Sequence, residues 1–445
     1  MQILARLRRD AGRTYYGWWI VAGSIGLQFL AAGLMVQAFG TYVAVWQAEF
    51  GWSKTAFAVA FALQRGMMAL LSPVQGWLIQ RFGPRRVIGV GLVILAIGFV
   101  LLSRFETRTG FYLSFLVVAL GVGLSGFLSL TSTIVNWFER RRASALALMQ
   151  IGISAGGLAV PLVAWWITTH GWRETALLSA GIVLVVGLPL SGLMRKTPEA
   201  YGLLPDGAPP PAAPPSGAGD GVRAGASDAA EPGRAGPADT DFRAGEALRT
   251  RAFWLITAGH AMAVSMVATV GVHIVVHLNE GLGLSIQTAA TLVAVLTGAQ
   301  MVGQLLGGVL GDRFPKRALA VGAMWTHALA LVIVAYAPSL PYALLFAVLH
   351  GLAWGVRGPI MQALRADYFG RSSFPTILGI SFSFVMLGQM VGPLFAGVLA
   401  DALGDYRLAF VLLAGAVAAA SLCFVFATPP ARPRRMARDP KGQCP

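Results

Sequence analysis

One arginine stands in the middle of a long apolar stretch that runs from Pro341 to Tyr368. Helical spacing places His350, Trp354 and Arg357 on one face of this stretch. A guanidinium in the bilayer core costs about 2.5–3.5 kcal/mol on insertion scales, so it normally faces protein or water rather than lipid. Its planar fork is suited to bind a carboxylate through two hydrogen bonds. The sequence therefore predicts a permeation site at Arg357, with a structural ion pair or a snorkelling side chain as the alternatives.

A second arginine, Arg65, lies near the middle of another apolar stretch. All 19 Asp and Glu residues fall in loops, in tails, in a Pro-rich segment or at the ends of apolar stretches. Two arginines without an internal carboxylate leave positive charge that an anionic substrate can balance. We therefore expect the cargo to be a small organic anion, a mono- or dicarboxylate. A hydrogen bond from Arg65 to backbone carbonyls near Gly66 is the alternative for that residue.

The other polar groups inside apolar stretches are histidines and glutamines. Without a carboxylate relay, coupling to a co-transported proton requires a histidine, and His260 and His350 are the candidates. A packing role is the alternative for both. Further substrate-binding candidates are amides in the expected first, eighth and eleventh spans: Gln28, Gln37, Gln300, Gln304 and Gln389. His273 and His277 have metal-competent spacing but no evident third ligand, so no metal or other cofactor is expected.

The amino-acid composition indicates that these polar groups lie within a lipid bilayer. Of the 445 residues 56% are hydrophobic and 12% are charged, and the mean hydropathy is +0.67, which is typical of an integral membrane protein. The net charge of +15 comes from short cationic segments between apolar stretches, a pattern of membrane topology rather than of nucleic-acid binding. Twelve membrane-spanning helices are expected, at about 18–44, 55–79, 86–104, 111–136, 143–168, 174–194, 253–278, 285–310, 317–337, 342–366, 375–400 and 408–428.

The distribution of Lys and Arg predicts the orientation. With the N-terminus in the cytoplasm, cytoplasmic segments hold 27 of the 34, external segments hold five, and Arg65 and Arg357 lie within spans. Both termini are therefore expected in the cytoplasm of a plasma membrane, taken to be a bacterial inner membrane. In this count Arg365 belongs to a cytoplasmic segment.

A Pro-, Ala- and Gly-rich segment divides the spans six and six, and it is expected to be a disordered tether. The expected divisions are a cytoplasmic arm (1–17), a six-helix lobe (18–194), the linker (195–250), a second six-helix lobe (251–428) and a basic tail (429–445).

The two halves repeat a cationic turn in the same place. Between the second and third spans stand Gly76, Gln80, Arg81, Gly83, Arg85 and Arg86, and between the eighth and ninth stand Gly308, Asp312, Arg313, Lys316 and Arg317. Two similar cationic turns at equivalent positions, in the same membrane orientation, indicate a parallel repeat of six spans. Two-lobed carriers that work by alternating access have this arrangement. We expect these turns, together with Arg140 and Arg141, to pair with the other lobe and hold one conformation.

At these residues the chain resembles the major facilitator superfamily, whose signature at this place is G-x-x-x-D-R/K-x-G-R/K-R/K. Gln80 replaces the acidic residue of the first copy, so that latch is expected to be weaker. The resemblance implies an all-α membrane fold of twelve helices, with two lobes of inverted three-helix repeats, and a protein that functions as a monomer.

Within the superfamily, Gly17-Trp18-Trp19 and the run from Asn136 to Ala143 are similar to the monocarboxylate-porter and oxalate/formate-exchanger group. The first span has no Lys, and the eighth has no Asp or Arg before Asp312. The group's anion-binding positions are therefore not transferred to this chain.

The leading hypothesis is a secondary or facilitative carrier of a small organic anion. Efflux of hydrophobic or drug-like compounds is the alternative, and a non-transporting receptor or scaffold is a third. No recognisable catalytic motif is present, so an enzyme is not expected.

Overall fold

The computed structural model describes residues 14–52, 54–208 and 241–431, and within them the chain forms twelve helical rods. The first lobe contains α2 (Gly17–Ala31), η1 (Ala32–Val36), α3 (Phe39–Phe50), α4 (Lys54–Phe82), α5 (Pro84–Leu102), α6 (Arg108–Ser125), α7 (Phe127–Trp137), α8 (Arg142–Leu158), α9 (Val160–His170), α10 (Trp172–Ile182), η2 (Val183–Gly187) and α11 (Leu188–Gly192). The second lobe contains α13 (Arg251–Leu282), α14 (Ile286–Arg313), α15 (Lys316–Ala335), α16 (Leu340–Phe369), α17 (Phe374–Leu403) and α18 (Arg407–Phe426).

Eleven helical segments in the described ranges are long and apolar enough to cross a membrane. The remaining rod, α4, carries Gln64, Arg65, Gln75 and Gln80 among its 29 residues. All twelve expected spans are thus helical, and the predicted all-α membrane fold of two six-helix lobes is confirmed.

Several rods of the first lobe are interrupted, which the sequence analysis did not predict. The first rod contains the π-helical turn η1, and a π-helical turn of this kind is common at functional sites. The fourth rod is broken at Gly126, where a Cβ would collide with the carbonyl of Val122. Both interruptions lie beside the central cavity described below, so they shape its wall.

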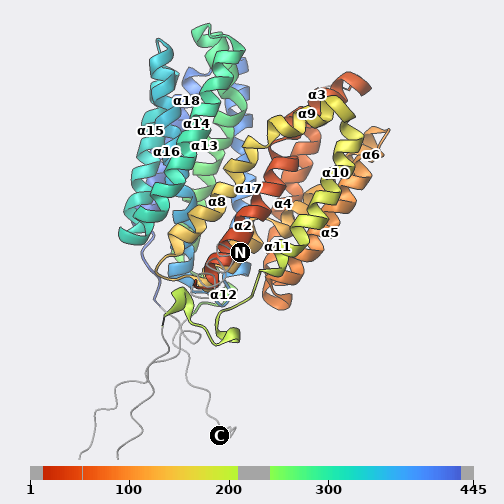
Figure 1. The fold of residues 1–445 in the computed structure, drawn as a ribbon. Coiled ribbons are helices and arrows are strands. Elements are labelled where there is room, and N and C mark those ends of the chain that lie inside the picture. Colours follow the sequence, from red (N-terminus) through yellow and green to blue (C-terminus); the bar gives the residue numbers. More distant parts are fainter. Residues whose placement is uncertain (1–13, 53, 209–240, 432–445) are drawn as a thin grey trace, which may run out of the picture.

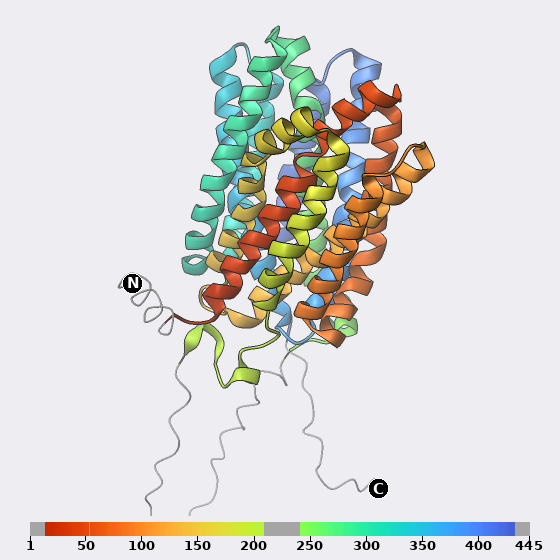
Figure 2. The ribbon, with the colours of Figure 1, turned by 45° about the vertical axis from the view of Figure 1, so that its right-hand side comes forward.

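The two lobes converge at the end of the molecule where α2 begins and α18 ends, and they diverge at the other end (Figures 1 and 2). We call these ends the terminal end and the far end. At the terminal end, α4 packs against α17 and α8 packs against α14. A Cβ on Gly76 would collide with the carbonyl of Pro375, and one on Gly308 would lie 2.8 Å from the Ala147 Cβ. These two glycines therefore allow the lobes to close there.

The flanks of the expected linker are folded rather than disordered, which corrects the sequence-based boundaries of that segment. They contain η3 (Glu199–Tyr201), η4 (Pro205–Gly207) and α12 (Ala244–Leu248). Asp206 accepts hydrogen bonds from the backbone N–H groups of Glu139 and Arg140, at 2.9 and 2.7 Å. Residues 209–240, like the arm 1–13 and the tail 432–445, lie outside the described residues, so the disorder expected for 209–240 stays a prediction.

The first flank also contacts the start of the first rod. Gly207 of this flank lies against the Tyr15 ring, where an added Cβ would be 3.0 Å from Cδ2, and Tyr15 donates a hydrogen bond to the Trp137 carbonyl at 2.8 Å. Burial, and then the charges of Asp206 and Glu199, raise the pKa of the Tyr15 hydroxyl. This part of the linker therefore covers the terminal end of the first lobe.

Candidate functional site

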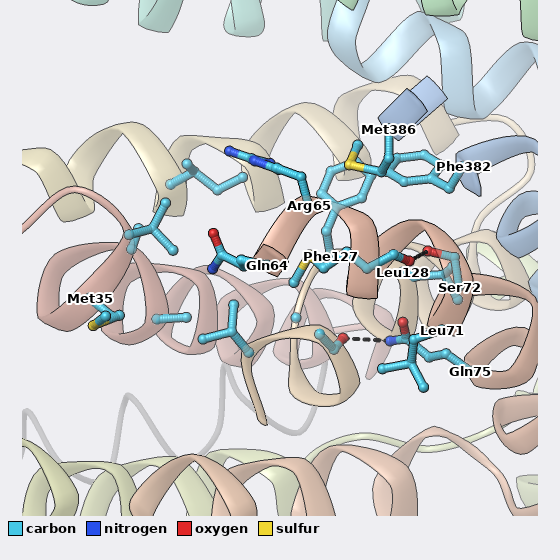
Figure 3. Close-up of a pocket in the computed structure, with 18 of the residues that line it drawn as sticks. Met35, Gln64, Arg65, Leu71, Ser72, Gln75, Phe127, Leu128, Phe382 and Met386 are labelled. Carbon is cyan, nitrogen blue, oxygen red and sulfur yellow. Dashed lines mark hydrogen bonds between the residues drawn. The ribbon is translucent and has the colours of Figure 1, made fainter. Parts of the chain in front are cut away.

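A cavity of about 260 Å³ lies in the middle of the molecule, mainly within the first lobe. Its walls come from α2 and η1, from the middle of α4, from α6, α7 and α8, and from α17 of the second lobe (Figure 3). Most of the surrounding side chains are apolar, and they include Met35, Phe39, Met68, Phe115, Phe127, Phe382 and Met386. The cavity is therefore suited to hold the apolar part of a small molecule.

Five polar side chains line this cavity: Gln28, Gln64, Arg65, Ser72 and Gln75. Gln75 and Ser72 use their donors on backbone carbonyls, those of Gly123 and Met68, both at 2.6 Å. The Nε2 of Gln28 is buried and has no hydrogen-bond partner among the described residues. Arg65 is half-buried and supplies the cation. Amides beside a guanidinium are groups that can orient a carboxylate.

Two aromatic rings from opposite lobes form the side of the cavity nearer the terminal end. Phe127 of α7 and Phe382 of α17 stack with ring centroids 5.4 Å apart. Figure 3 shows them gathered with Met386, close to Arg65. The His260 ring also lies 6.2 Å from the Phe382 ring, measured between centroids. Phe382 thus contacts both the cavity and a polar cluster in the second lobe.

That polar cluster is centred on Arg365, which the sequence analysis had counted as cytoplasmic. The structure corrects this placement, because the Arg365 side chain is buried, with 1% of the residue exposed. It donates from Nη2 to His260 Nδ1 at 3.0 Å, from Nε to Ser381 Oγ at 3.2 Å and from Nη1 to the Met361 carbonyl at 3.1 Å. Ser381 shares a further hydrogen bond with Thr257 at 2.8 Å.

Arg357 is also buried, with 1% of the residue exposed, and it does not line the cavity. Its Nε and Nη1 have no hydrogen-bond partner among the described residues, and no salt bridge in the same ranges involves it. The snorkelling alternative does not fit this burial. Next to it, Gln150 of α8 approaches the backbone at Gly358. Arg357 therefore lies where the lobes meet, out of contact with the cavity in this conformation.

The remaining predicted binding residues are dispersed. His350 is fully buried and packs against His327 with ring centroids 4.7 Å apart, and Trp354 packs in the core of the second lobe. Gln304 accepts a hydrogen bond from Ser154 across the lobes at 3.3 Å. Of the other expected amides, Gln37 is exposed, while Gln300 and Gln389 are half-buried. Only Gln28 and Arg65 of the predicted set line the cavity.

The sequence analysis missed Gln64, Gln75, Gln150 and Arg365. The signal for each was available, since each is a polar residue inside a helix of apolar composition. Gln64 directly precedes Arg65, and Arg365 was assigned to the nearest cationic segment because it lies close to the end of its helix. His273 and His277 bond to the carbonyls of Pro393 and Val334, both at 2.9 Å. The part of the chain that the structure describes holds no group of three metal-ligating side chains.

The terminal end is held closed by hydrogen bonds and ion pairs between the lobes. Asp312 accepts from the backbone N–H groups of Ala143 and Ser144 at 2.8 and 3.2 Å, at the start of α8. In the other copy of the motif, Thr376 donates to Gln80 Oε1 at 2.7 Å. The charged Asp312 contact is the stronger of the two, because a carboxylate at a helix N-terminus is favoured by the helix dipole.

Two further groups of ions join the lobes at this end. Arg142 of the first lobe pairs with Asp367 of the second at 2.5 Å, and Lys316 supports this carboxylate from within the second lobe at 2.8 Å. Arg371 of the second lobe pairs with Glu139 at 3.3 Å and Glu199 at 3.1 Å, and it donates to the Asn136 carbonyl at 2.8 Å. Arg142 and Arg371 were not among the predicted latch residues.

Among the described residues, none of the cations of the two motifs forms a salt bridge to the opposite lobe in this conformation. Within the described residues, no salt bridge involves Arg81, Arg85, Arg86, Arg140, Arg141 or Arg313. Arg317 donates to the Phe424 carbonyl at 3.1 Å and to that of Val425, within the second lobe. Gly83 has a positive φ of 83° and allows the sharp turn into α5.

The sequence of this chain is similar to those of known membrane transporters. A family model described as Major Facilitator Superfamily matches residues 25–277 and 253–443. Monocarboxylate transporter 13 of Bos taurus is 27% identical over 440 residues, covering 95% of this chain and 94% of that protein. Monocarboxylate transporter 11 of Homo sapiens is 26% identical, covering 92% and 82%.

Solved structures show the same fold at low identity. The chain resembles the E. coli fucose:proton symporter with a TM-score of 0.68 and 15% identity, covering 92% of this chain and 98% of that one. It resembles the human organic anion transporter MFSD10 with a TM-score of 0.67 and 15% identity, covering 91% and 98%. These relatives are membrane transporters rather than enzymes.

Proposed function

Because the chain belongs to the major facilitator superfamily and is a multi-pass membrane transporter of that family, we propose that it carries a small organic anion by alternating access. The single observation that carries the proposal is the set of cations without internal counter-charges. Arg357 and Arg365 are buried at the lobe interface and in the second lobe, and neither forms a salt bridge within the described residues. A buried cation is costly unless something compensates it, and a transported carboxylate supplies that compensation.

The cavity supports a substrate with both an anionic and an apolar part. Arg65 and Gln28 offer donors to a carboxylate, whereas Met35, Phe127 and Phe382 offer apolar contact. We therefore favour a monocarboxylate with a short apolar or aromatic tail over a dicarboxylate. The relatives named monocarboxylate transporters are consistent with this class.

In the proposed cycle the lobes rock about the central cavity. With both termini in the cytoplasm, the present conformation is open outward and closed inward by the Asp312, Asp367 and Arg371 contacts. Substrate enters from the far end and meets Arg65, and the terminal contacts then separate while the far ends close. Arg357, where the lobes meet, is the second cation that the substrate reaches.

Proton coupling, if it occurs, has few available groups. An arginine N–H is always a donor, so the Arg365 contact requires His260 to present the lone pair of Nδ1 and to be neutral. His350 and its neighbour His327 remain as titratable groups, and their four ring nitrogens have no partner among the described residues. We propose exchange or facilitated diffusion of the anion as the basic mode, with any proton bound at this histidine pair.

The apolar lining also favours a second candidate, efflux of hydrophobic compounds. Uptake of labelled pyruvate, butyrate and benzoate into proteoliposomes separates the two, compared with a labelled lipophilic cation. We expect carboxylate uptake that falls at least tenfold in Arg65→Gln and Arg357→Gln. The control is Arg251→Gln, since Arg251 is exposed at the start of α13. Movement of the cation without the carboxylates would reject the anion proposal.

A further inference from the structure

Three buried or half-buried arginines lie at different depths along the proposed path. Counted along their helices at about 1.5 Å per residue, Arg365 lies about 6 Å from the terminal end of α16 and Arg357 about 18 Å. Arg65 lies about 25 Å from the terminal end of α4. In the present conformation only Arg65 reaches the cavity. The other two cations are positioned for a later stage of transport.

The guanidinium group of Arg365 has more N–H donors than the hydrogen bonds that it forms. A guanidinium has five N–H groups, and the three hydrogen bonds of Arg365 go to His260, Ser381 and the Met361 carbonyl, all of them neutral acceptors. Two N–H groups, one on each terminal nitrogen, are therefore left over, and a bidentate carboxylate contact needs one donor from each of two guanidinium nitrogens. His260 and Ser381 fix the orientation of this guanidinium.

The parts of this cluster respond differently when the lobes rock. His260, Arg365 and Ser381 come from α13, α16 and α17, all of them in the second lobe, so their hydrogen bonds survive a rigid-body motion of that lobe. The Phe127–Phe382 contact joins opposite lobes and must break when the terminal end opens. Ala363 and Ala366, the neighbours of Arg365 on α16, pack in the hydrophobic cluster of the first lobe. Opening of the terminal end therefore frees this part of α16 from the first lobe and separates Phe127 from Phe382, the ring that the His260 ring contacts.

We propose that Arg365, with His260 and Ser381, forms a second carboxylate site, which connects to the central cavity and to the terminal side when Phe127 and Phe382 separate. This inference rests on the proposed anion transport and adds an inner binding site to it. A carboxylate passes from Arg65 to Arg357 and then to Arg365, and it leaves to the terminal side. In the reverse direction, Arg365 is the first cation that a carboxylate meets.

The test is the KM for exchange measured separately from each side of proteoliposomes, with the best transported of labelled pyruvate, butyrate and benzoate. In Arg365→Gln we expect the KM from the terminal side to rise at least tenfold and the KM from the far side to stay within twofold. Arg251→Gln serves as the control and should leave both values unchanged. A KM that is unchanged on both sides, or raised equally on both, overturns the inner site, because a purely structural arginine has no preference for one side.

A second variant, Arg365→Lys, keeps the test valid if Arg365→Gln does not fold. Arg365→Lys keeps the charge but loses the planar fork, so we expect a smaller rise in KM, still confined to the terminal side. If Arg365→Gln does not fold, Arg365→Lys decides the question. Its KM values would then reject the site if they equal those of wild type on both sides of the membrane. Failure of the proposed function looks different: wild-type vesicles would then exchange none of the three carboxylates.

Discussion

Arg357 offers the most informative substitution, because its predicted effects on stability and on binding have opposite signs. Its Nε and Nη1 are buried without a hydrogen-bond partner among the described residues. An unsatisfied buried donor costs about 1–3 kcal/mol, and more on a charged group. Arg357→Met keeps most of the volume of the side chain and removes both donors and the charge. We expect its free energy of unfolding to exceed that of wild type by about 2 kcal/mol, since some of the relief is lost to imperfect packing.

The same substitution should remove most of the stabilisation that the substrate gives to the folded protein. A ligand at 100 times its Kd stabilises the folded state by about 2.7 kcal/mol. Wild-type protein in detergent should gain about this amount from saturating carboxylate, and Arg357→Met should gain less than a third of it. Urea titration followed by tryptophan fluorescence measures both quantities. A variant that is less stable than wild type, yet still stabilised by carboxylate, would refute the reasoning that Arg357 is kept for an anion.

The remaining predictions concern the latch and the inner cluster. Gln80→Glu places a carboxylate beside the start of α17 at Thr376, so it should stabilise the terminally closed state by about 0.3–1 kcal/mol and slow exchange. The readout is stronger alkylation of a Met35→Cys probe in a background without native cysteines, and equal alkylation contradicts the latch assignment. Asp312→Asn should have the opposite effect, since it weakens two backbone contacts at the start of α8; undiminished alkylation would show that this contact is dispensable. His260→Asn retains an acceptor near the position of Nδ1 for Arg365, so it should leave the KM from the terminal side near the wild-type value, whereas His260→Leu should raise that KM as Arg365→Gln does; an equal rise in both variants would contradict the orienting role of His260.

Much of the architecture was predictable because it follows from simple periodic signals. Apolar stretches of membrane-spanning length predicted the twelve rods, and the repeated cationic turns at Gly76 and Gly308 predicted two similar lobes. The interruptions at η1 and Gly126 were not predicted. They depend on how neighbouring helices pack, and a glycine such as Gly126 does not by itself show that an apolar helix breaks there.

The candidate site was only partly predictable. Mid-span polarity selected Gln28 and Arg65, which line the cavity, but it also selected Gln37, which is exposed. Arg365 was missed because distance from the end of a helix is a poor guide to burial where another helix covers that end. The sequence also could not predict that Arg357 is buried away from the cavity, because this depends on which conformation the lobes adopt.

The central claim is that guanidinium groups in the transport path bind the charge of the substrate. The most direct test compares the affinity of purified wild-type protein for a monocarboxylate and for its methyl ester, which has the same carbon skeleton without the charge. The account predicts that the carboxylate binds at least a hundredfold more tightly. Equal affinities, or tighter binding of the ester, would contradict it.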